Sequence, residues 1–312
     1  MRIFHDFKDL PEDFQNGAAA IGNFDGVHLG HQAVIGEAGR IAKAAGVSWL
    51  VVTLEPHPRS LFRPDDPPFR LTPIAAKARR IAALGVDGLV VLGFDSAFSQ
   101  QSAEHFVRAI LVEGLAAHHV VSGYDFAFGH RRQGDGALLL KIGRELGFGF
   151  TSIRPVSDGG GAVLSASRAR QYLTEGEPAG AAAVLGAPFE IEGVVLTGDA
   201  RGRTLGFPTA NLALGDHIRP AKGVYAVRVA VEGGAETWHA GVANLGNRPT
   251  FDKTDLLLEA HLFDFTGDLY GKTLRVAFID YLRPEKKFDG IDGLKAQIAQ
   301  DSDQARRILA AA

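Results

Sequence analysis

The first half of the chain alternates short strand-like segments with amphipathic helical stretches. This alternation limits the possible folds more than any other feature. Strands are expected at residues 18–21, 49–54, 88–92, 119–122 and 149–153, and the first three are apolar runs typical of buried strands. Between them, helical periodicity marks residues 31–45, 73–84, 103–115 and 137–146. This order predicts a doubly wound α/β domain with a parallel sheet and right-handed crossovers.

The rhythm changes near residue 189, where strand-like runs follow one another without helices between them. These runs are residues 190–197, 224–231, 237–242, 256–263 and 273–281. Such a series is typical of a small antiparallel β-barrel, and a C-terminal helix is expected over residues 294–311. Two short helices are expected within residues 167–185. We therefore predict two domains, residues 1–186 and 187–312.

Composition narrows the classes of partner and setting. The 33 Lys and Arg against 36 Asp and Glu, a formal net charge of −3, argue against nucleic acid as a partner. Because cysteine is absent, disulfides and thiolate sites are excluded, and a cytoplasmic setting is expected. No apolar run reaches the roughly 18 residues of a membrane span, so no membrane partner is expected. No feature of the sequence predicts an oligomeric state.

A glycine-rich cluster, residues 22–32, directly follows the first apolar run. Gly22 and Gly30 let the backbone approach a ligand closely. His28 and His31 lie three residues apart where a helix begins, so both imidazoles can face one ligand. Together with the helix N-terminus, they can stabilise the negative charge that develops on the oxygens of an α-phosphate during nucleotidyl transfer from ATP. The alternatives are that the histidines only cap the helix, or that they bind a metal, for which no third ligand lies nearby.

A second glycine-flanked segment, residues 123–129, follows the fourth expected strand and begins the loop 123–136. In a parallel sheet the carboxyl ends of the strands meet at one edge, so this loop is expected beside the loop at residues 22–30. Phe126 and Phe128 can stack on a flat ring, or they can anchor the core. Phe62 is a further candidate for stacking.

The predicted barrel carries its own set of polar residues. Thr209 and Asn211 alternate along an extended segment, so their oxygens share one face and suit Mg²⁺ when ATP phosphates supply the negative charge. Glu259 lies on the polar face of the strand 256–262, where a carboxylate can take the proton of a primary alcohol. The alternative for Glu259 is an ordinary solvated strand residue.

These segments together resemble a known family. The pattern Gly-x-Phe-Asp-x-x-His-x-Gly-His within residues 22–31 resembles the nucleotidyltransferase superfamily, and its longer form resembles bacterial bifunctional riboflavin kinase/FAD synthetases. Residues 54–58 and 123–129 agree with that family. Residues 205–211, 241–250 and 258–272 resemble its riboflavin kinase module. The resemblance extends from about residue 14 to residue 308.

For the first half, the resemblance implies adenylylation of FMN by ATP, which yields FAD and pyrophosphate. It implies catalytic roles for His28, His31 and Arg168. The ATP-binding residues that it implies here are Gly22, Asn23, Phe24, Asp25, Gly30, Ser165 and Ser167. The flavin-binding residues that it implies are Phe62, Asp125, Phe126 and Phe128.

One segment departs from the family pattern. Residues 165–170 stand where the family has Ser-Ser-Thr-Arg-Ile-Arg, with Ala166, Ser167 and Ala169 replacing Ser, Thr and Ile. Ser167 keeps a hydroxyl and Arg168 keeps its charge, so contacts with the β- and γ-phosphates are still expected.

For the second half, the resemblance implies phosphorylation of riboflavin by ATP to give FMN and ADP. Thr209 and Asn211 then serve Mg²⁺, and Glu259 is the catalytic base. The ATP-binding residues implied here are Gly202, Arg203, Gly206 and Pro208. Two alternatives are a nucleotidyltransferase for another phosphate ester with a passive barrel, and a flavin-binding sensor. Neither would need Glu259.

Overall fold

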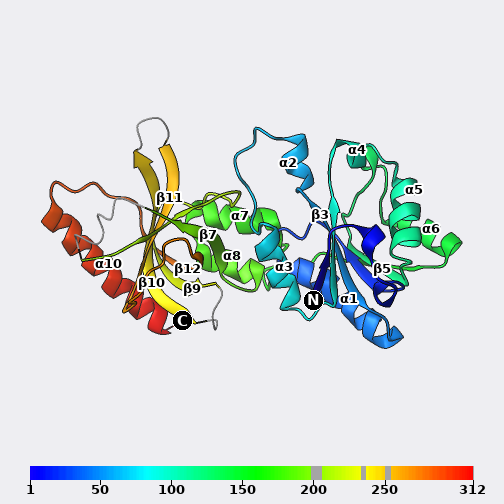
Figure 1. Cartoon of the computed structure of the whole chain (residues 1–312), viewed down its shortest axis with the longest axis horizontal. Helices are drawn as coiled ribbons and strands as arrows, with labels where there is room; N and C mark the ends of the chain where they lie inside the picture. The colour runs from blue at the N-terminus through cyan, green and yellow to red at the C-terminus, as the bar shows by residue number, and fades with distance from the viewer. Residues whose placement is uncertain (198–205, 233–236, 250–253, 312) are drawn as a thin grey trace. The chain divides into compact units, whose positions relative to one another are not determined.

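The computed structural model describes residues 1–197, 206–232, 237–249 and 254–311 (Figure 1). The chain forms two compact units. The first unit comprises Met1–Pro67 and Thr72–Ser165, and the second comprises Pro68–Leu71 and Ala166–Ala312. The functional division at residue 186 stays a prediction.

The first unit is built on a six-stranded sheet with the order β1-β4-β3-β2-β5-β6, in which every pair is parallel. Its strands are β1 (Arg2–Phe4), β2 (Ala18–Ile21), β3 (Trp49–Glu55), β4 (Gly88–Gly93), β5 (His119–Gly123) and β6 (Gly149–Ile153). Its α-helices are α1 (Leu29–Ala45), α2 (Pro58–Phe62), α3 (Ile74–Ala82), α4 (Ser96–Ser99), α5 (Ala103–His105) and α6 (Gly136–Leu146). The predicted doubly wound parallel sheet is confirmed.

The central strands of the sheet are buried on both faces, which explains why β2, β3 and β4 consist mainly of apolar residues. Val52 of β3 packs on one face in a cluster with Phe106 and Ile110, which belong to the π-helix η3 (Phe106–Gly114). Its neighbour Val51 packs on the other face with residues of α1 and α3, such as Ile35. Successive side chains of a strand thus reach opposite cores, as the pleat requires.

Strand β2 stands at the point where the order of the strands reverses. It pairs with β3 on one side and with β5 on the other. The chain runs outward from β2 through β3 to β4, then returns to β5 and β6. The loops after β2 and β5 therefore leave the same edge of the sheet as neighbours, which is the usual place for a ligand in such folds.

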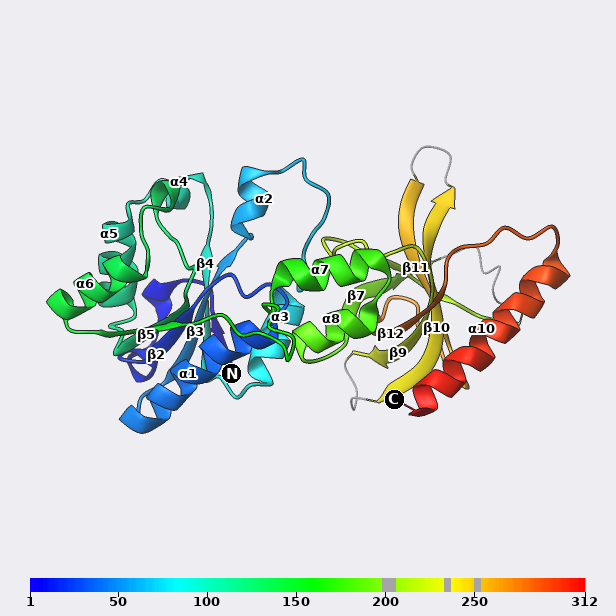
Figure 2. The same ribbon diagram turned by 180° about the vertical axis from the view of Figure 1, so that it is seen from behind.

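The second unit contains a closed barrel with the order β10-β11-β8-β7-β12-β9, and its strand pairs are antiparallel. The strands are β7 (Phe189–Leu196), β8 (Ala210–Ala213), β9 (Gly223–Val231), β10 (Trp238–Pro249), β11 (Thr254–Leu262) and β12 (Thr273–Arg283). The helices are α7 (Ala166–Glu175), α8 (Pro178–Leu185) and α10 (Ile291–Ala311), which Figure 2 shows from the other side. Ala305 and Leu309 of α10 pack against Val224 and Val242. The predicted barrel and its C-terminal helix are confirmed.

Three details differ from the sequence prediction. Strands β1 and β8 have three and four residues and were not predicted as strands, because neither is a continuous apolar run. The helix expected over residues 103–115 becomes a π-helix after His105. In addition, none of the helices that the structure describes is long and apolar enough to cross a membrane.

Candidate active sites

A cavity of about 700 Å³ lies in the first unit and takes its walls from the segments that follow β2, β3, β4 and β5. Ligand pockets span roughly 300–1,000 Å³, so this cavity has room for a ligand of nucleotide size. The predicted meeting of the loops after β2 and β5 is confirmed, because Asn23 and Asp125 both line the cavity.

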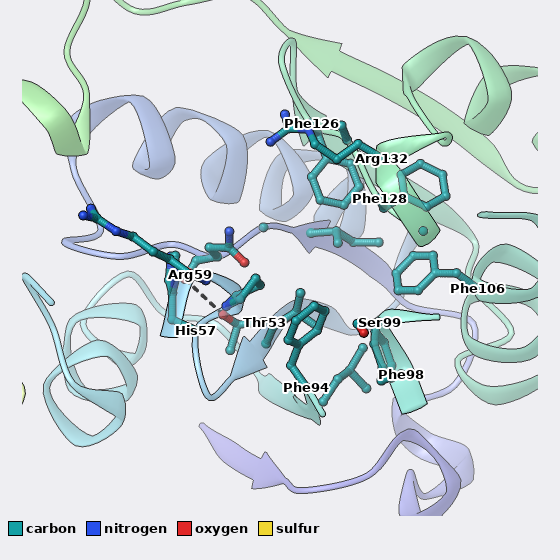
Figure 3. A pocket seen from close by; sticks show the side chains of 18 of the residues that line it. Thr53, His57, Arg59, Phe94, Phe98, Ser99, Phe106, Phe126, Phe128 and Arg132 are labelled. Atoms are coloured by element: carbon teal, nitrogen blue, oxygen red, sulfur yellow. Dashed lines mark hydrogen bonds between the residues drawn. The ribbon is translucent and has the colours of Figure 1, made fainter. Parts of the chain in front are cut away.

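Phenylalanine rings form one wall of the cavity (Figure 3). The rings of Phe126 and Phe128 stack with their centroids 5.4 Å apart, and Phe106 lies 5.2 Å from Phe128. Phe128 is buried and belongs to the core, whereas Phe126 is half-buried. Phe128 therefore lines the cavity and anchors the core at once, and Phe126 offers more ring surface to a ligand. Phe62 also lines the cavity, with 63% of its surface exposed.

The glycine-rich cluster divides into residues that line the cavity and residues that support them. Gly22, Asn23, Phe24 and His31 line it. His28 is the N-cap of α1, where its Nδ1 accepts a hydrogen bond from the backbone N–H of His31 at 3.3 Å. Because Nδ1 is an acceptor, the neutral ring carries its proton on Nε2.

The two imidazoles stack on each other. Their ring centroids are 3.5 Å apart with an angle of 25° between the planes, and His28 is buried. His31 is thus the imidazole that faces the cavity, and His28 caps the helix and supports the His31 ring. The sequence left open whether the histidines cap the helix or face a ligand. In the structure His28 does the first, and His31 lies on the cavity wall.

Asp25 holds the loop in shape and does not line the cavity. It is buried, and its Oδ1 accepts the backbone N–H of Thr72 at 3.0 Å, while the Thr72 hydroxyl accepts the N–H of Gly26 at 2.8 Å. Phe24 and Val27 have φ values of 48° and 42°, in the region that non-glycine residues rarely adopt. Strain of this kind persists only where the surroundings enforce it, and it concentrates at functional sites.

Gly30 lies in the first turn of α1 and is also absent from the cavity wall. A Cβ at this position would lie 3.0 Å from Cε1 and Nδ1 of His28 and 3.1 Å from the carbonyl oxygen of Leu164. The glycine therefore allows the imidazole to sit against the helix.

A cationic part of the wall was not predicted from the sequence. Arg59, Arg63, Arg131 and Arg132 line the cavity, as does His57. Arg131 and Arg132 have φ values of 53° and 59°, so their turn is strained as well. Both lie within the loop 123–136 that was predicted at this edge of the sheet, so their charge in that loop was the available signal. Figure 3 shows Arg132 beside Phe126, and Arg59 on the side of Thr53 and His57.

The segment that departs from the family pattern spans the two units. Ser165 ends the first unit, while Ser167 and Arg168 lie in α7 of the second. The Nη2 of Arg168 donates a hydrogen bond to the Tyr172 hydroxyl at 3.1 Å. The assignment of these residues to ATP phosphates stays a prediction.

In the second unit, the register of the barrel aligns three polar residues across neighbouring strands. Asn211 of β8 lies opposite Glu259 of β11, and Glu259 lies opposite Asn244 of β10. Directly opposite residues of an antiparallel pair have Cβ atoms about 4.5–5.5 Å apart. Asn244 was not predicted, because only the strand register brings it to Glu259.

The adjacent row of side chains points into the barrel, since its members, Leu212, Leu258 and Leu245, are fully buried. The row of Asn211, Glu259 and Asn244 thus faces outward. Asn211 Oδ1 is nevertheless buried and accepts no hydrogen bond from any residue that the structure describes. A buried carbonyl oxygen without a donor suits a cation.

Thr209 lies just before this row and lines a small cavity of about 80 Å³ together with Pro208, Asp268 and Tyr270. The Nδ1 of His261 donates a hydrogen bond to the Pro208 carbonyl at 2.8 Å. Gly206 precedes them with a φ of 87°. Gly202 and Arg203, which were predicted to bind ATP, lie outside the described residues.

Within the described parts of the chain, no group of three or more His, Asp or Glu residues is arranged to hold a metal ion. An ion near Asn211 would therefore need oxygen ligands from a substrate as well, which is how Mg²⁺ usually binds beside nucleotide phosphates.

Comparison with known proteins agrees with this two-part organisation. Residues 10–167 match the FAD synthetase family, and residues 185–309 match the riboflavin kinase family. The chain is 41% identical over 310 residues to the bifunctional riboflavin kinase/FMN adenylyltransferase of Escherichia coli strain K12, covering 99% of this chain and 98% of that protein. It is 36% identical to the protein of the same name from Bacillus subtilis strain 168, covering 98% and 97%.

A solved structure has the same fold. It is described as a macrolide-efflux protein from Streptococcus pneumoniae and is 31% identical in sequence. The match covers 97% of this chain and 98% of that one, with a TM-score of 0.85.

Proposed function

The chain belongs to the family of bifunctional riboflavin kinase/FMN adenylyltransferases, and from that premise we propose which residues carry out each reaction. The C-terminal part phosphorylates riboflavin to FMN, and the N-terminal part adenylylates FMN to FAD. Riboflavin, FMN and ATP are the substrates. A nucleotidyltransferase with a passive barrel is excluded, because residues 185–309 match the riboflavin kinase family.

We assign FMN adenylylation to the 700 Å³ cavity. The observation that carries this assignment is that one cavity joins a phenylalanine wall to the His31 end of the glycine-rich loop. The wall that includes Phe126 suits the isoalloxazine ring, which is flat and aromatic. Asn23 and His31, beside the N-terminus of α1, suit the phosphates of ATP. Asp125, Phe62 and Phe128 remain proposed flavin contacts.

In this reaction a phosphate oxygen of FMN attacks the α-phosphorus of ATP and pyrophosphate leaves. No proton has to be removed from the attacking phosphate, so the task of the protein is to align the two reactants and to stabilise negative charge. Hydrogen bonds from His31 and from the first turn of α1 can do so without reorganising. His28 contributes by fixing the ring of His31, with which it stacks at 3.5 Å.

We assign riboflavin phosphorylation to the row that contains Asn211 and Glu259. The carboxylate of Glu259 would accept the proton of the riboflavin 5′-hydroxyl as that oxygen attacks the γ-phosphorus of ATP. Gly206 and Pro208 would lie along the ATP, and Asn244 would help to orient Glu259 from the neighbouring strand.

The residues of this row fit Mg²⁺. The buried Oδ1 of Asn211 and the hydroxyl of Thr209 are hard oxygens, and Asn211 Oδ1 accepts no hydrogen bond within the described residues. When bound, Mg²⁺ would neutralise charge on the β- and γ-phosphates of ATP. We propose Mg²⁺ for both reactions, and a cytoplasmic setting from the use of ATP by a chain without cysteine.

Two single substitutions test the division of labour. His31→Ala should abolish the formation of FAD from FMN and ATP while the chain still converts riboflavin to FMN. Glu259→Ala should abolish the formation of FMN, while FAD still forms when FMN is supplied. Both are measured by chromatographic separation of the three flavins after incubation with ATP and Mg²⁺. If either variant lost both reactions while remaining folded, the assignment of two separate sites would be wrong.

A further inference from the structure

Lys77, on α3, is a fully buried cation that the proposed chemistry does not use. Its side chain has no exposed surface, and it is absent from the cavity wall. Its Nζ donates a hydrogen bond to Thr53 Oγ1 at 3.2 Å and lies 3.8 Å from Glu55 Oε2. Burial of an ammonium group is strongly unfavourable unless partners compensate, so its presence in the core needs an explanation.

The hydrogen bonds of Lys77 lead to the cavity. Thr53 lies near the carboxyl end of β3 and lines the cavity, and its hydroxyl donates to the backbone carbonyl of Asn23 at 3.2 Å. An ammonium group can only donate, and a hydroxyl has a single hydrogen. The bond from Lys77 therefore occupies a lone pair of Thr53 and leaves the hydroxyl hydrogen for Asn23. Such a chain is polarised in one direction, which strengthens each bond.

The loop at the end of this chain requires support. Asn23 is followed by Phe24, Gly26 and Val27, which have φ values of 48°, 83° and 42°. Thr72 supports the distal side of the loop, through Asp25 and Gly26. Thr53 supports its proximal side at Asn23. A loop with strained residues keeps its shape only while both supports hold.

We propose that Lys77 is a positioning residue for adenylyl transfer. It orients the Thr53 hydroxyl, which in turn holds the Asn23 carbonyl and with it the part of the loop that faces ATP. The inference rests on the proposed assignment of this loop to ATP. Lys77 touches no substrate, and its effect is confined to the placement of the loop.

The experiment separates alignment of the reactants from stability and from flavin binding. Lys77→Met keeps the length of the side chain and removes the donor. Thr53→Val keeps the shape of the side chain and removes the hydroxyl, whereas Thr53→Ser keeps the hydroxyl. Lys141→Met, on the exposed face of α6, is the control for loss of a lysine charge. For each variant we would measure kcat and KM for FAD formation, the dissociation constant of FMN by flavin fluorescence, riboflavin phosphorylation, and thermal unfolding.

Since a misplacement of about 1 Å can reduce a rate about 100-fold, Lys77→Met and Thr53→Val should each lower kcat for FAD formation by roughly 10- to 100-fold. Affinity for FMN and the rate of riboflavin phosphorylation should stay within about twofold. Thr53→Ser and Lys141→Met should behave like the original chain. The double variant should be no worse than the poorer single variant, because both changes break the same hydrogen-bond chain.

Two results would overturn the inference. One is a Thr53→Val variant with unchanged kcat for FAD formation, which decides the matter even if Lys77→Met does not fold. The other is a double variant, Lys77→Met with Thr53→Val, whose loss of kcat for FAD formation equals the product of the two single losses. The His31→Ala variant is assayed alongside. If this variant still forms FAD, the assignment of the site itself fails. If it forms no FAD while Lys77→Met and Thr53→Val remain fully active, only the role of Lys77 is refuted.

Discussion

The replacement of Gly30 by alanine tests whether the position of His28 matters for adenylyl transfer. The added Cβ would lie 3.0 Å from Cε1 and Nδ1 of His28 and 3.1 Å from the Leu164 carbonyl. Contacts of 3.0–3.1 Å are tighter than ordinary van der Waals contacts, so these neighbours must give way by a few tenths of an ångström. The imidazole is the more mobile neighbour, and its movement would shift the ring of His31, with which it stacks.

Since a misplacement of about 1 Å can cost about 100-fold, this smaller displacement should lower the rate of FAD formation by about 3- to 10-fold, which corresponds to roughly 0.7–1.4 kcal/mol in the activation free energy. The assay is single-turnover conversion of FMN to FAD with saturating ATP. Riboflavin phosphorylation by the same preparation reports on the second unit and should not change.

Gly36→Ala is the matched control, because Gly36 lies in the same helix and no atom lies within 4 Å of a Cβ placed there. Alanine in that position should stabilise the helix by up to about 1 kcal/mol and leave both activities unchanged. If Gly30→Ala formed FAD within about twofold of the original rate, the role given to the stacked histidines would be refuted.

Three further changes probe other parts of the molecule. Phe126→Ala should weaken FMN binding about tenfold, since stacking on an aromatic side chain is worth roughly 1–3 kcal/mol, and fluorescence titration with FMN would measure it. Asn211→Leu should reduce riboflavin phosphorylation at all Mg²⁺ concentrations and spare FAD formation from added FMN; equal loss of both would contradict the assignment. Burial holds the pKa of His217 below its usual value of 6.5. As the pH falls through about 6.5, the unfolded chain therefore takes up a proton before the folded chain does, and the second unit should lose stability. His217→Asn should flatten this dependence, as judged by urea unfolding between about pH 7.5 and pH 5.5, and an unchanged slope would show that other groups dominate.

The structure also refines the glycine-rich loop. From the spacing alone, His28 and His31 were expected to face one ligand as equivalent groups. The structure assigns the cavity wall to His31 and the N-cap of α1 to His28. Asp25, which was grouped with the ATP-binding residues, is buried and bonded to Thr72. The difference arises because spacing along a helix shows which residues are neighbours but not which of them is covered by the rest of the fold.

The sequence by itself determined the two architectures and the positions of the main loops. Strand β2 begins and ends where predicted, because an apolar run buried on both faces is visible without knowing its partners. The edge strand β6 also has the predicted bounds, although its residues are only partly buried. The residues of the glycine-rich loop stood out because glycine and paired histidines mark a close approach to phosphate at the start of a helix.

Only the tertiary structure decided which distant residues meet. Asn244 lies opposite Glu259 through the register of β10 against β11. Lys77 is linked to Asn23 through Thr53, and these three residues lie about 25 to 55 positions apart in the sequence. The arginines at residues 131–132 and the phenylalanine wall come together because four loops leave the same edge of the sheet. The physical reason is that periodicity is a local property, whereas strand register and buried hydrogen bonds depend on the folded packing of the whole unit.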